Sequence, residues 1–527
     1  MTSSEFQVSR RSALVGLGML LVAVAVLVES RGSATTFFFD EWGWVLHRSH
    51  SDLLPALLES HNGHPSVVPS GVFRLLFAVF GIDDYRPFRA AGILVHLFVM
   101  VAVVALVWSR KGPVLGLAAG AVVGAMGAGW QNILWPFQIG MNGSVAAGLL
   151  VLWLLDRPGP RRSALAAGAL LVSLACSSIG ISVAFGVAVR LGLARRWREW
   201  WVVLGPGACY GIWFLVYGES SLRWGNARLV PGYFLDASSG AVAGLAARPL
   251  TVGALGSGVL LVLCARRLVG GESGRAHVLG LLAIPLSFWM LTGLGRAHLG
   301  EPTASRYVFV GGVFVAVIVA EVLPRPRTVL AASAVGLAAA VMVWGGWGIL
   351  EEEGRIWRWR SDIVRAELLA LEWSADSVDS GYRPDLARAP QIVAGPYLDA
   401  VAMLGSPAYS LERVRSASEE ARQQADRVSF ESLRAAPAGV ASPVGRTCQD
   451  LGSNESVEVS PGVVVVAVDS DVDVRVARLA NVFPQAIVGK VLVGTAAVVD
   501  IPEDRGPSTW RVQIWTASGA LWCPAEG

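Results

Sequence analysis

The chain has 527 residues, of which 54% are hydrophobic and only 16% are charged, and its mean hydropathy is +0.53. A soluble globular protein is about one-quarter charged, and several apolar stretches here approach the ~20 residues that a helix needs to cross a bilayer. This composition excludes an ordinary soluble protein, and the net charge of +3 is too small to indicate nucleic acid as a partner. We therefore predict an all-α polytopic membrane protein.

The first apolar stretch, residues 12–28, follows Arg10 and Arg11 and could be mistaken for a signal peptide. No convincing cleavage site follows its apolar core, so we expect a retained signal anchor whose N-terminus is cytoplasmic. Residues 29–85 are then expected to form a long extracytoplasmic loop. Two segments of this loop, 44–61 and 65–81, are amphipathic and are predicted to be helices at the membrane interface.

Short clusters of arginine separate the later apolar stretches, and the positive-inside rule places such clusters in the cytoplasm. This rule predicts about eleven spans, which puts the C-terminus outside. The spans are 12–28, 86–109, 113–130, 142–155, 163–178, 179–193, 199–217, 249–265, 276–293, 306–322 and 327–349. Residues 218–248 are expected to form a second outer loop.

One choice decides this topology. Residues 163–190 could form one long helix, which would reverse the orientation of every later span. We favour two helices that divide at "CSSIGIS" (176–182), because this division keeps every basic cluster inside. Short helices interrupted by Gly and Ser are also common where a membrane protein lines a cavity.

The composition changes after the last span. The transmembrane domain is predicted to cover 1–350, and 351–373 a connecting helix. A small β-rich extracytoplasmic domain is predicted for 374–527, because "DVDVRVARL" (471–479) alternates with the period of a half-buried strand. Cys448 and Cys523 form an isolated pair there, which predicts one disulfide in an oxidising compartment. The alternative is two unrelated free cysteines.

The first candidate site follows the first span. Asp40 and Glu41 stand among the aromatic residues of "FFFDEW" (37–42), and His47, His50, His61 and His64 come soon afterwards. Apolar neighbours can raise the pKa of a carboxyl group and make it a better general base. The alternative is a solvated loop with an aromatic belt at the interface. The histidine spacing matches no common zinc pattern, and "SHNGHP" (60–65) is typical of a tight turn.

The second candidate site lies between two late spans on the predicted outer face. The segment 293–307 contains Arg296, His298, Glu301, Arg306 and Tyr307. Arginine suits phosphate because its planar guanidinium donates two parallel, charge-assisted hydrogen bonds. The alternative is an ordinary polar loop.

Two further arginines, Arg86 and Arg89, open the second span. One of them is a candidate phosphate partner. The alternative for both is a long side chain that reaches from a helix end toward the interface.

With these residues in view, the N-terminal part of the chain resembles the GT-C membrane glycosyltransferases. The likeness is greatest to the branch of protein O-mannosyltransferases and lipid A aminoarabinose transferases. It rests on the order of "DEW" (40–42), "HP" (64–65), "FRLLFAVFG" (73–81) and a second span that begins "FRAAG" (88–92), and it covers residues 12–110. The chain has "HPS" where relatives often have two prolines, which leaves its subfamily open.

The resemblance implies an enzyme that transfers a sugar from a polyprenyl-phosphate donor to an envelope glycan, lipid or protein acceptor on the outer face of the cell membrane. By position, Asp40 would be the base that activates the acceptor, and Glu41 would assist it or bind a divalent cation such as Mg²⁺ or Mn²⁺. Arg296 and Arg306 are then our candidates for the donor phosphate, and His61 and His64 for further substrate contacts. A flippase for polyprenyl-linked glycans and a non-catalytic glycan-binding membrane protein are the alternatives.

Overall fold

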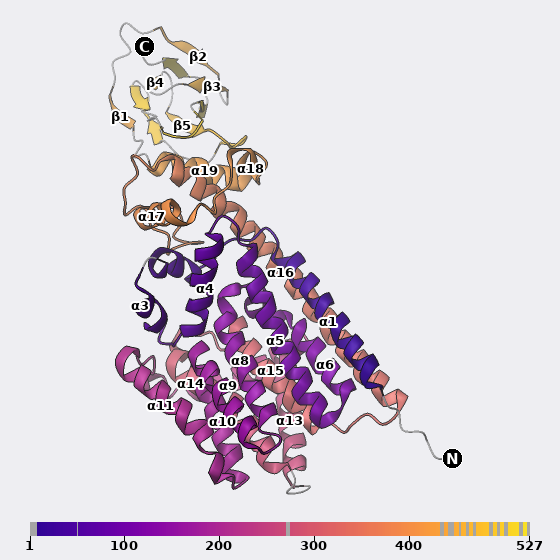
Figure 1. Ribbon diagram of the computed structural model, residues 1–527. Coiled ribbons are helices and arrows are strands. Elements are labelled where there is room, and N and C mark those ends of the chain that lie inside the picture. The colour runs from indigo at the N-terminus through magenta and orange to yellow at the C-terminus, as the bar shows by residue number, and fades with distance from the viewer. Residues whose placement is uncertain are drawn as a thin grey trace. The chain divides into compact units, whose positions relative to one another are not determined.

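The computed structural model describes residues 8–49, 51–269 and 274–432, and in the C-terminal part residues 437–440, 447–452, 455–459, 463–466, 471–483, 489–492, 496–499, 504–507, 509–515 and 520–523. The chain divides into two compact units (Figure 1). Unit 1 comprises Met1–Ser33, Ser51–Leu76 and Arg86–Ile356, and unit 2 comprises Ala34–His50, Phe77–Tyr85 and Trp357–Gly527. The residues of the first predicted outer loop are therefore shared between the two units.

Unit 1 is helical. Its helices are α1 (Arg10–Gly32), α3 (Leu53–Leu58), α4 (Val67–Phe80, which continues into unit 2), α5 (Arg86–Lys111), α6 (Pro113–Gly124), α7 (Trp130–Leu134), α8 (Ile139–Leu154), α9 (Pro160–Cys176), α10 (Ile179–Leu193), α11 (Trp201–Tyr217), α12 (Val230–Leu245), α13 (Leu250–Val269), α14 (Arg275–Arg296), α15 (Ser305–Val322) and the first part of α16 (Val329–Trp373). Every predicted span overlaps one of these helices, although the span 113–130 runs past the end of α6 at Gly124. The prediction of a polytopic membrane protein is confirmed.

Helix length and composition give fewer spans than the predicted eleven. Among the described residues, eight helices are long and apolar enough to cross a membrane. A bent pair, Pro113–Gly124 with Gly127–Leu134, makes nine if it counts as one span. The predicted number of about eleven is reached only if α9 and α10, with 17 and 15 residues, also span.

The predicted division of 163–193 into two helices is confirmed. Helix α9 ends at Cys176, Ser177 is extended, and α10 begins at Ile179. A Cβ atom at Gly180 would lie only 2.7 Å from the backbone of Leu174, so the chain turns back closely on itself at a glycine. A continuous helix would keep these two residues well apart.

The predicted second outer loop contains a helix: α12 occupies Val230–Leu245 and packs against α13 and α15. It has only 16 residues, and small side chains let it pack closely: a Cβ atom at Gly253 would lie 2.0 Å from the Ser239 carbonyl oxygen. The prediction that 44–61 forms one helix is wrong. It contains the short π-helical turn η1 (Trp44–Arg48) and α3, with extended backbone at Asp52 between them.

Unit 2 contains α2 (Asp40–Gly43), η1, the end of α16, three helices and a β-sandwich. The three helices are α17 (Ala394–Leu404), α18 (Leu411–Arg415) and α19 (Glu419–Ser432). The strands are β1 (Pro437–Val440), β2 (Gln449–Leu451), β3 (Ser456–Val459), β4 (Val463–Val466), β5 (Val472–Ala477), β6 (Gly489–Val491), β7 (Ala496–Val499), β8 (Trp510–Trp515) and β9 (Ala520–Cys523). The predicted β-rich region therefore begins with helices, which the sequence analysis did not separate.

The strands form two antiparallel sheets with the orders β1-β7-β4-β9-β2 and β3-β8-β5-β6. Strand β5 shows the predicted alternation, because Val472, Val474 and Val476 are buried whereas Asp473 is exposed. These valines form a core with Trp510 and other apolar residues of the sandwich. The prediction of a small β-rich region is thus confirmed.

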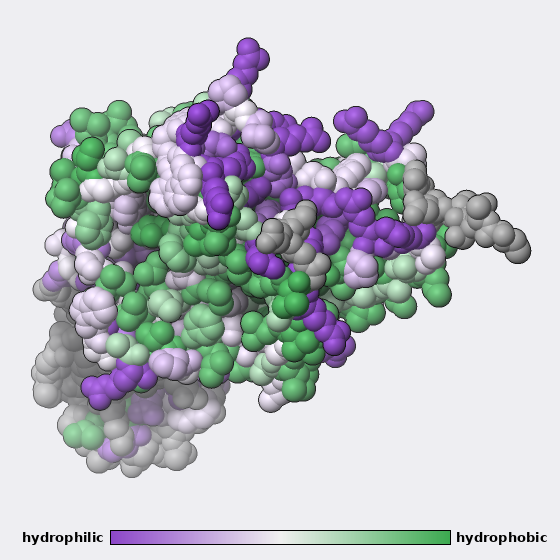
Figure 2. Space-filling model, turned by 90° about the horizontal axis from the view of Figure 1, so that it is seen from below, coloured by the Kyte–Doolittle hydropathy of each residue, from purple (hydrophilic) through white to green (hydrophobic). Residues whose placement is uncertain are grey.

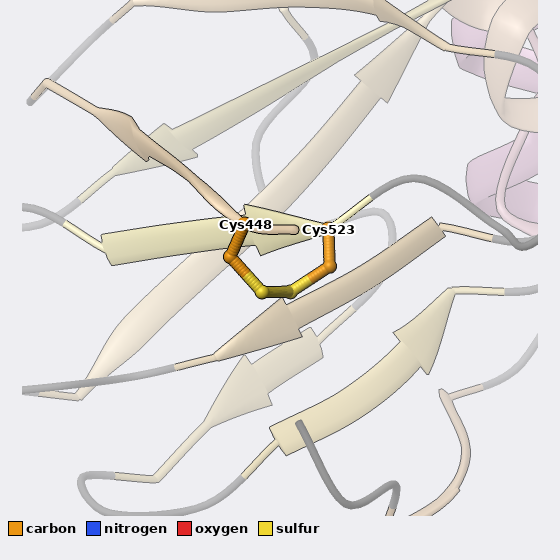
Figure 3. The surroundings of a disulfide bond; sticks show 2 residues. All are labelled: Cys448 and Cys523. Carbon is orange, nitrogen blue, oxygen red and sulfur yellow. A yellow bond between two sulfur atoms is a disulfide. The ribbon is translucent and has the colours of Figure 1, made fainter. Parts of the chain in front are cut away.

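The predicted disulfide between Cys448 and Cys523 is present (Figure 3). Cys448 directly precedes β2, and Cys523 ends β9, with which β2 pairs. The bond closes a chain segment of 75 residues and fastens β2 at the edge of its sheet.

Removal of this bond is expected to destabilise the sandwich. A disulfide that closes a long loop contributes roughly 2–4 kcal/mol, mainly by restricting the unfolded chain. The double variant C448S/C523S should therefore unfold at a lower temperature, as measured by the thermal midpoint of the purified protein. Cys209 is free and exposed, so C209S is the matched control. An unchanged midpoint in the double variant would contradict this expectation.

Candidate functional site

A cavity of about 360 Å³ lies within unit 1, where the ends of several helices and the turns between them meet. Its lining comes from the turn before α4, the break between α9 and α10, the chain after α11, the end of α14 and the start of α15. Much of the lining is apolar, including Ile179, Phe288 and Leu291. The polar lining residues include His64, Ser178, Tyr210, Glu219, Arg296 and Tyr307. This mixture suits an amphiphilic ligand better than a purely polar one.

Arg296 supplies the positive charge of this cavity. It is the last residue of α14, where the carboxyl end of the helix dipole favours a cation. Its side chain is partly exposed, and its Nη2 atom lies 3.5 Å from the carbonyl oxygen of Asn62. A guanidinium held so loosely retains most of its donors for a ligand.

His64 reaches the cavity from a tight turn, as the sequence predicts. His61 and His64 exchange two backbone hydrogen bonds of 3.0 Å, and Asn62 and Gly63 between them have positive φ angles. The His64 Nδ1 atom lies 2.8 Å from the Ser178 hydroxyl. Burial, and secondarily the charge of Arg296, lower the pKa of His64 to about 4. The His61 ring packs on Phe137 instead, with 5.4 Å between the ring centroids.

The low pKa of His64 predicts a pH effect on stability. In the unfolded chain, histidine takes up a proton as the pH falls through about 6.5, whereas the folded protein resists protonation until about pH 4. The free energy of unfolding should therefore fall by about 2 kcal/mol between pH 7 and pH 4.5 on account of this group. Thermal midpoints across this range should fall less in H64Q than in the wild type. Parallel curves for the two proteins would contradict the prediction.

Of the five candidates in 293–307, Arg296 and Tyr307 line the cavity. Arg306 lies beside them: its guanidinium is 4.9 Å from the Tyr307 ring centroid, 3.4 Å from the Gln131 side-chain oxygen and 3.8 Å from Glu301. His298 is exposed and contacts the side-chain amide of Asn226. The segment is therefore partly a cavity wall and partly a surface loop.

The two arginines at the start of α5 lie elsewhere in unit 1. Arg89 is buried, and its guanidinium forms a bidentate ion pair with Glu29 at 2.7 and 2.8 Å. A third hydrogen bond goes to the carbonyl oxygen of Gly32, at the end of α1. Arg89 thus joins α5 to α1, and its donors are occupied by protein groups. Arg86 is exposed.

The acidic pair belongs to unit 2, and its two members differ. Glu41 is fully buried and accepts hydrogen bonds from the Phe38 N–H at 2.9 Å and from the Tyr85 hydroxyl at 2.8 and 3.0 Å. Phe39 lies between Phe38 and the acidic pair and has a φ of 41°, which is unfavourable for a side chain of its size. The hydrogen bond from the Phe38 N–H to Glu41 stabilises this strained turn. Asp40, which is half-buried, begins α2 directly after it.

The aromatic residues around the pair form a packed wall. Phe37 is buried and contacts Trp42 and Tyr85, with ring centroids 5.6 and 4.8 Å apart. Trp42 is also fully buried, and its ring lies 6.0 Å from that of Tyr397. These side chains are therefore core residues of unit 2, whereas an interfacial belt would expose them.

Nothing in the described part of the chain forms a metal site of the usual kind. No group of three or more His, Cys, Asp or Glu side chains is placed to hold a metal there. The oxygens of Glu41 already accept hydrogen bonds from protein donors, so a protein-held divalent cation does not fit this residue well. His50 lies outside the described residues. A divalent cation requirement stays a prediction.

Tyr210 and Glu219 also line the cavity, although they were not predicted from the sequence. Glu219 lies in a predicted outer loop, and no motif surrounds it. Ser177, Ser178 and Ser182 did carry a signal, because the Gly/Ser-rich break was predicted to line a cavity.

No protein-family model matches the chain, and no curated protein matches its sequence. Among solved structures, the chain is similar to the crystal structure of ArnT from Cupriavidus metallidurans bound to undecaprenyl phosphate. The two are 14% identical with a TM-score of 0.47, and the match covers 75% of this chain and 85% of that chain. The likeness concerns the fold alone, and what ArnT binds is a property of that protein.

Proposed function

We propose that the chain is a membrane glycosyltransferase that takes a sugar from a polyprenyl-phosphate-linked donor. The observation that carries this proposal is the cavity of unit 1, where the Arg296 guanidinium stands beside an apolar wall. A donor of this class joins an anionic phosphate to a long apolar chain. A cation next to apolar side chains matches both parts of such a molecule.

The residues of the cavity have defined roles in this proposal. Arg296 would bind the phosphate, and the hydroxyl of Tyr307 would donate a further hydrogen bond to it. Phe288 and Leu291 would contact the apolar part of the donor. The acceptor hydroxyl attacks the anomeric carbon of the sugar and loses its proton to a base, while the bond from that carbon to the phosphate oxygen breaks. Negative charge then grows on the departing phosphate, so Arg296 would stabilise the transition state more than the bound donor.

Asp40 is the proposed base. This assignment rests on the order of motifs after the first span and on the environment of the pair within unit 2. Glu41 is committed to the Phe38 N–H and to Tyr85, whereas Asp40 is only half-buried. The roles of Asp40 and Arg296 are proposed on separate grounds and are tested by separate variants.

We also propose that the N-terminus is cytoplasmic and that the β-sandwich lies outside the cell membrane. The disulfide Cys448–Cys523 supports this orientation, because stable disulfides form in oxidising compartments. The acceptor, which is an envelope glycan, lipid or protein in this proposal, would then be met on the outer face.

Full-length protein in liposomes, supplied with polyprenyl-phosphate sugars, tests the proposed function. Consumption of one donor with release of polyprenyl phosphate is the expected result. Mass spectrometry of envelope glycans and glycolipids should then identify the acceptor. It is the species that lacks one sugar in cells without the protein and carries this sugar in cells that have it. Movement of intact donor between leaflets without consumption would instead indicate a flippase. Unchanged glycans, together with donors that are neither consumed nor moved between leaflets, would contradict both activities.

A further inference from the structure

A second cavity of unit 1, of about 450 Å³, has a strongly basic lining. It lies where α5, α8, α13 and α15 end, and its lining contains five cationic side chains and two carboxylates. The cations come from four predicted cytoplasmic loops, which are well separated in the sequence. The positive-inside rule requires basic residues in such loops, but it does not require that they converge around one cavity.

The two carboxylates of this lining, Glu321 and Asp156, form ion pairs with arginines. Arg110 makes a bidentate ion pair with Glu321 at 3.0 and 3.1 Å. It also lies 3.2 Å from Asp156, and Arg190, which does not line this cavity, donates to Asp156 at 2.8 Å. Both carboxylates are therefore already compensated by arginines.

Beyond these two carboxylates and their arginines, the lining carries positive charge at Lys111, Arg157 and Arg325. Backbone contacts position two of them: Lys111 donates to the Leu323 carbonyl at 3.0 Å, and Arg325 donates to the Arg110 carbonyl. Arg157 and Arg325 are exposed. Figure 2 views this end of the unit 1 helices and shows hydrophilic side chains gathered among apolar ones.

We propose that this cavity binds a phosphate-bearing anion, and that the headgroup of an anionic phospholipid is its main source. Like charges held this close repel one another, and an anion between them removes that repulsion. Arginine forks match phosphate oxygens, so phosphate is the chemistry that this lining recognises best. The cavity lies at the ends of apolar spans, which is where lipid headgroups are found, and basic pockets between such helices bind anionic lipids. The inference does not depend on the proposed transferase activity.

Native mass spectrometry of the delipidated full-length protein tests this site. Cardiolipin and phosphatidylglycerol should each be retained roughly tenfold better than phosphatidylcholine, since each basic residue near a membrane surface contributes about 1 kcal/mol to the binding of anionic lipid. Inorganic phosphate at millimolar concentration serves as the soluble probe. Displacement of cardiolipin by phosphate would show that the phosphate group itself is recognised, whereas retention against phosphate would assign the site to the lipid.

The double variant R157Q/R325Q should lose roughly tenfold in cardiolipin retention. The matched control is R223Q/R228Q, which removes two exposed arginines of unit 1 that do not line this cavity. Equal retention of phosphatidylcholine and cardiolipin by the wild-type protein would overturn the proposal without any variant. Equal losses in the two double variants would overturn it as well.

Discussion

Asn in place of Asp40 is expected to reduce sugar transfer by roughly 10²–10⁴-fold, the contribution of a positioned general base. The amide has nearly the shape of the carboxylate but cannot take the acceptor proton at neutral pH. Asp40 is half-buried at the start of α2, so the substitution leaves the core of unit 2 intact. The measurement is release of polyprenyl phosphate by purified protein in liposomes, with D52N as the control because Asp52 is exposed in the same predicted loop.

The neighbouring carboxylate provides a sharper comparison. Glu41 is buried and holds the Phe38 N–H and the Tyr85 hydroxyl, so E41Q should lower the thermal midpoint more than D40N does. Leaving a buried hydrogen-bonding group without its partner costs about 1–3 kcal/mol. Y85F should share this effect on stability. If E41Q stayed fully stable and D40N transferred sugar at the wild-type rate, the assignment of the two carboxylates would be wrong.

Features with a periodic or local signal could be predicted from the sequence. The apolar stretches predicted the helices, because transfer into lipid depends on composition alone. The break between α9 and α10 followed from "CSSIGIS", and β5 from the alternation in "DVDVRVARL". The disulfide was predictable because Cys448 and Cys523 were the only cysteines outside the apolar spans.

Features that depend on a distant partner could not be predicted in this way. In helix α12, the residues Pro231, Asp236 and Ser238 interrupt the apolar sequence, so no apolar stretch marked it as a helix; it is stabilised by close packing on other helices. Arg89 was a phosphate candidate until its partner Glu29 was known, and nothing in the sequence relates these two residues. Glu41 likewise looked equivalent to Asp40, because its partner Tyr85 lies 44 residues away. The residue types at the candidate site were predictable, but the sequence did not indicate which of them line the cavity and which bond within the protein.

Arg296 should be the cavity residue most sensitive to substitution. In R296Q, the rate of sugar transfer is expected to fall by roughly 10²–10³-fold, comparable to the loss of one essential donor in a charge-stabilising site. R296K keeps the charge but not the planar fork, so its rate should lie between those of R296Q and the wild type. Because Arg296 is partly exposed at the end of α14, neither variant should lower the thermal midpoint substantially.

Arg306 is the informative comparison for this prediction. Its guanidinium already contacts Tyr307 and Gln131, so R306Q should affect donor binding less than R296Q does. Native mass spectrometry with polyprenyl phosphate, the part of the donor that lacks the sugar, measures binding separately from transfer. Equal losses in R296Q and R306Q would make both arginines phosphate ligands, as the sequence alone predicts. If R296Q bound polyprenyl phosphate as well as the wild type does, the donor phosphate would not bind in this cavity, whatever the result for Asp40. A bound phosphate must be compensated by a nearby cation.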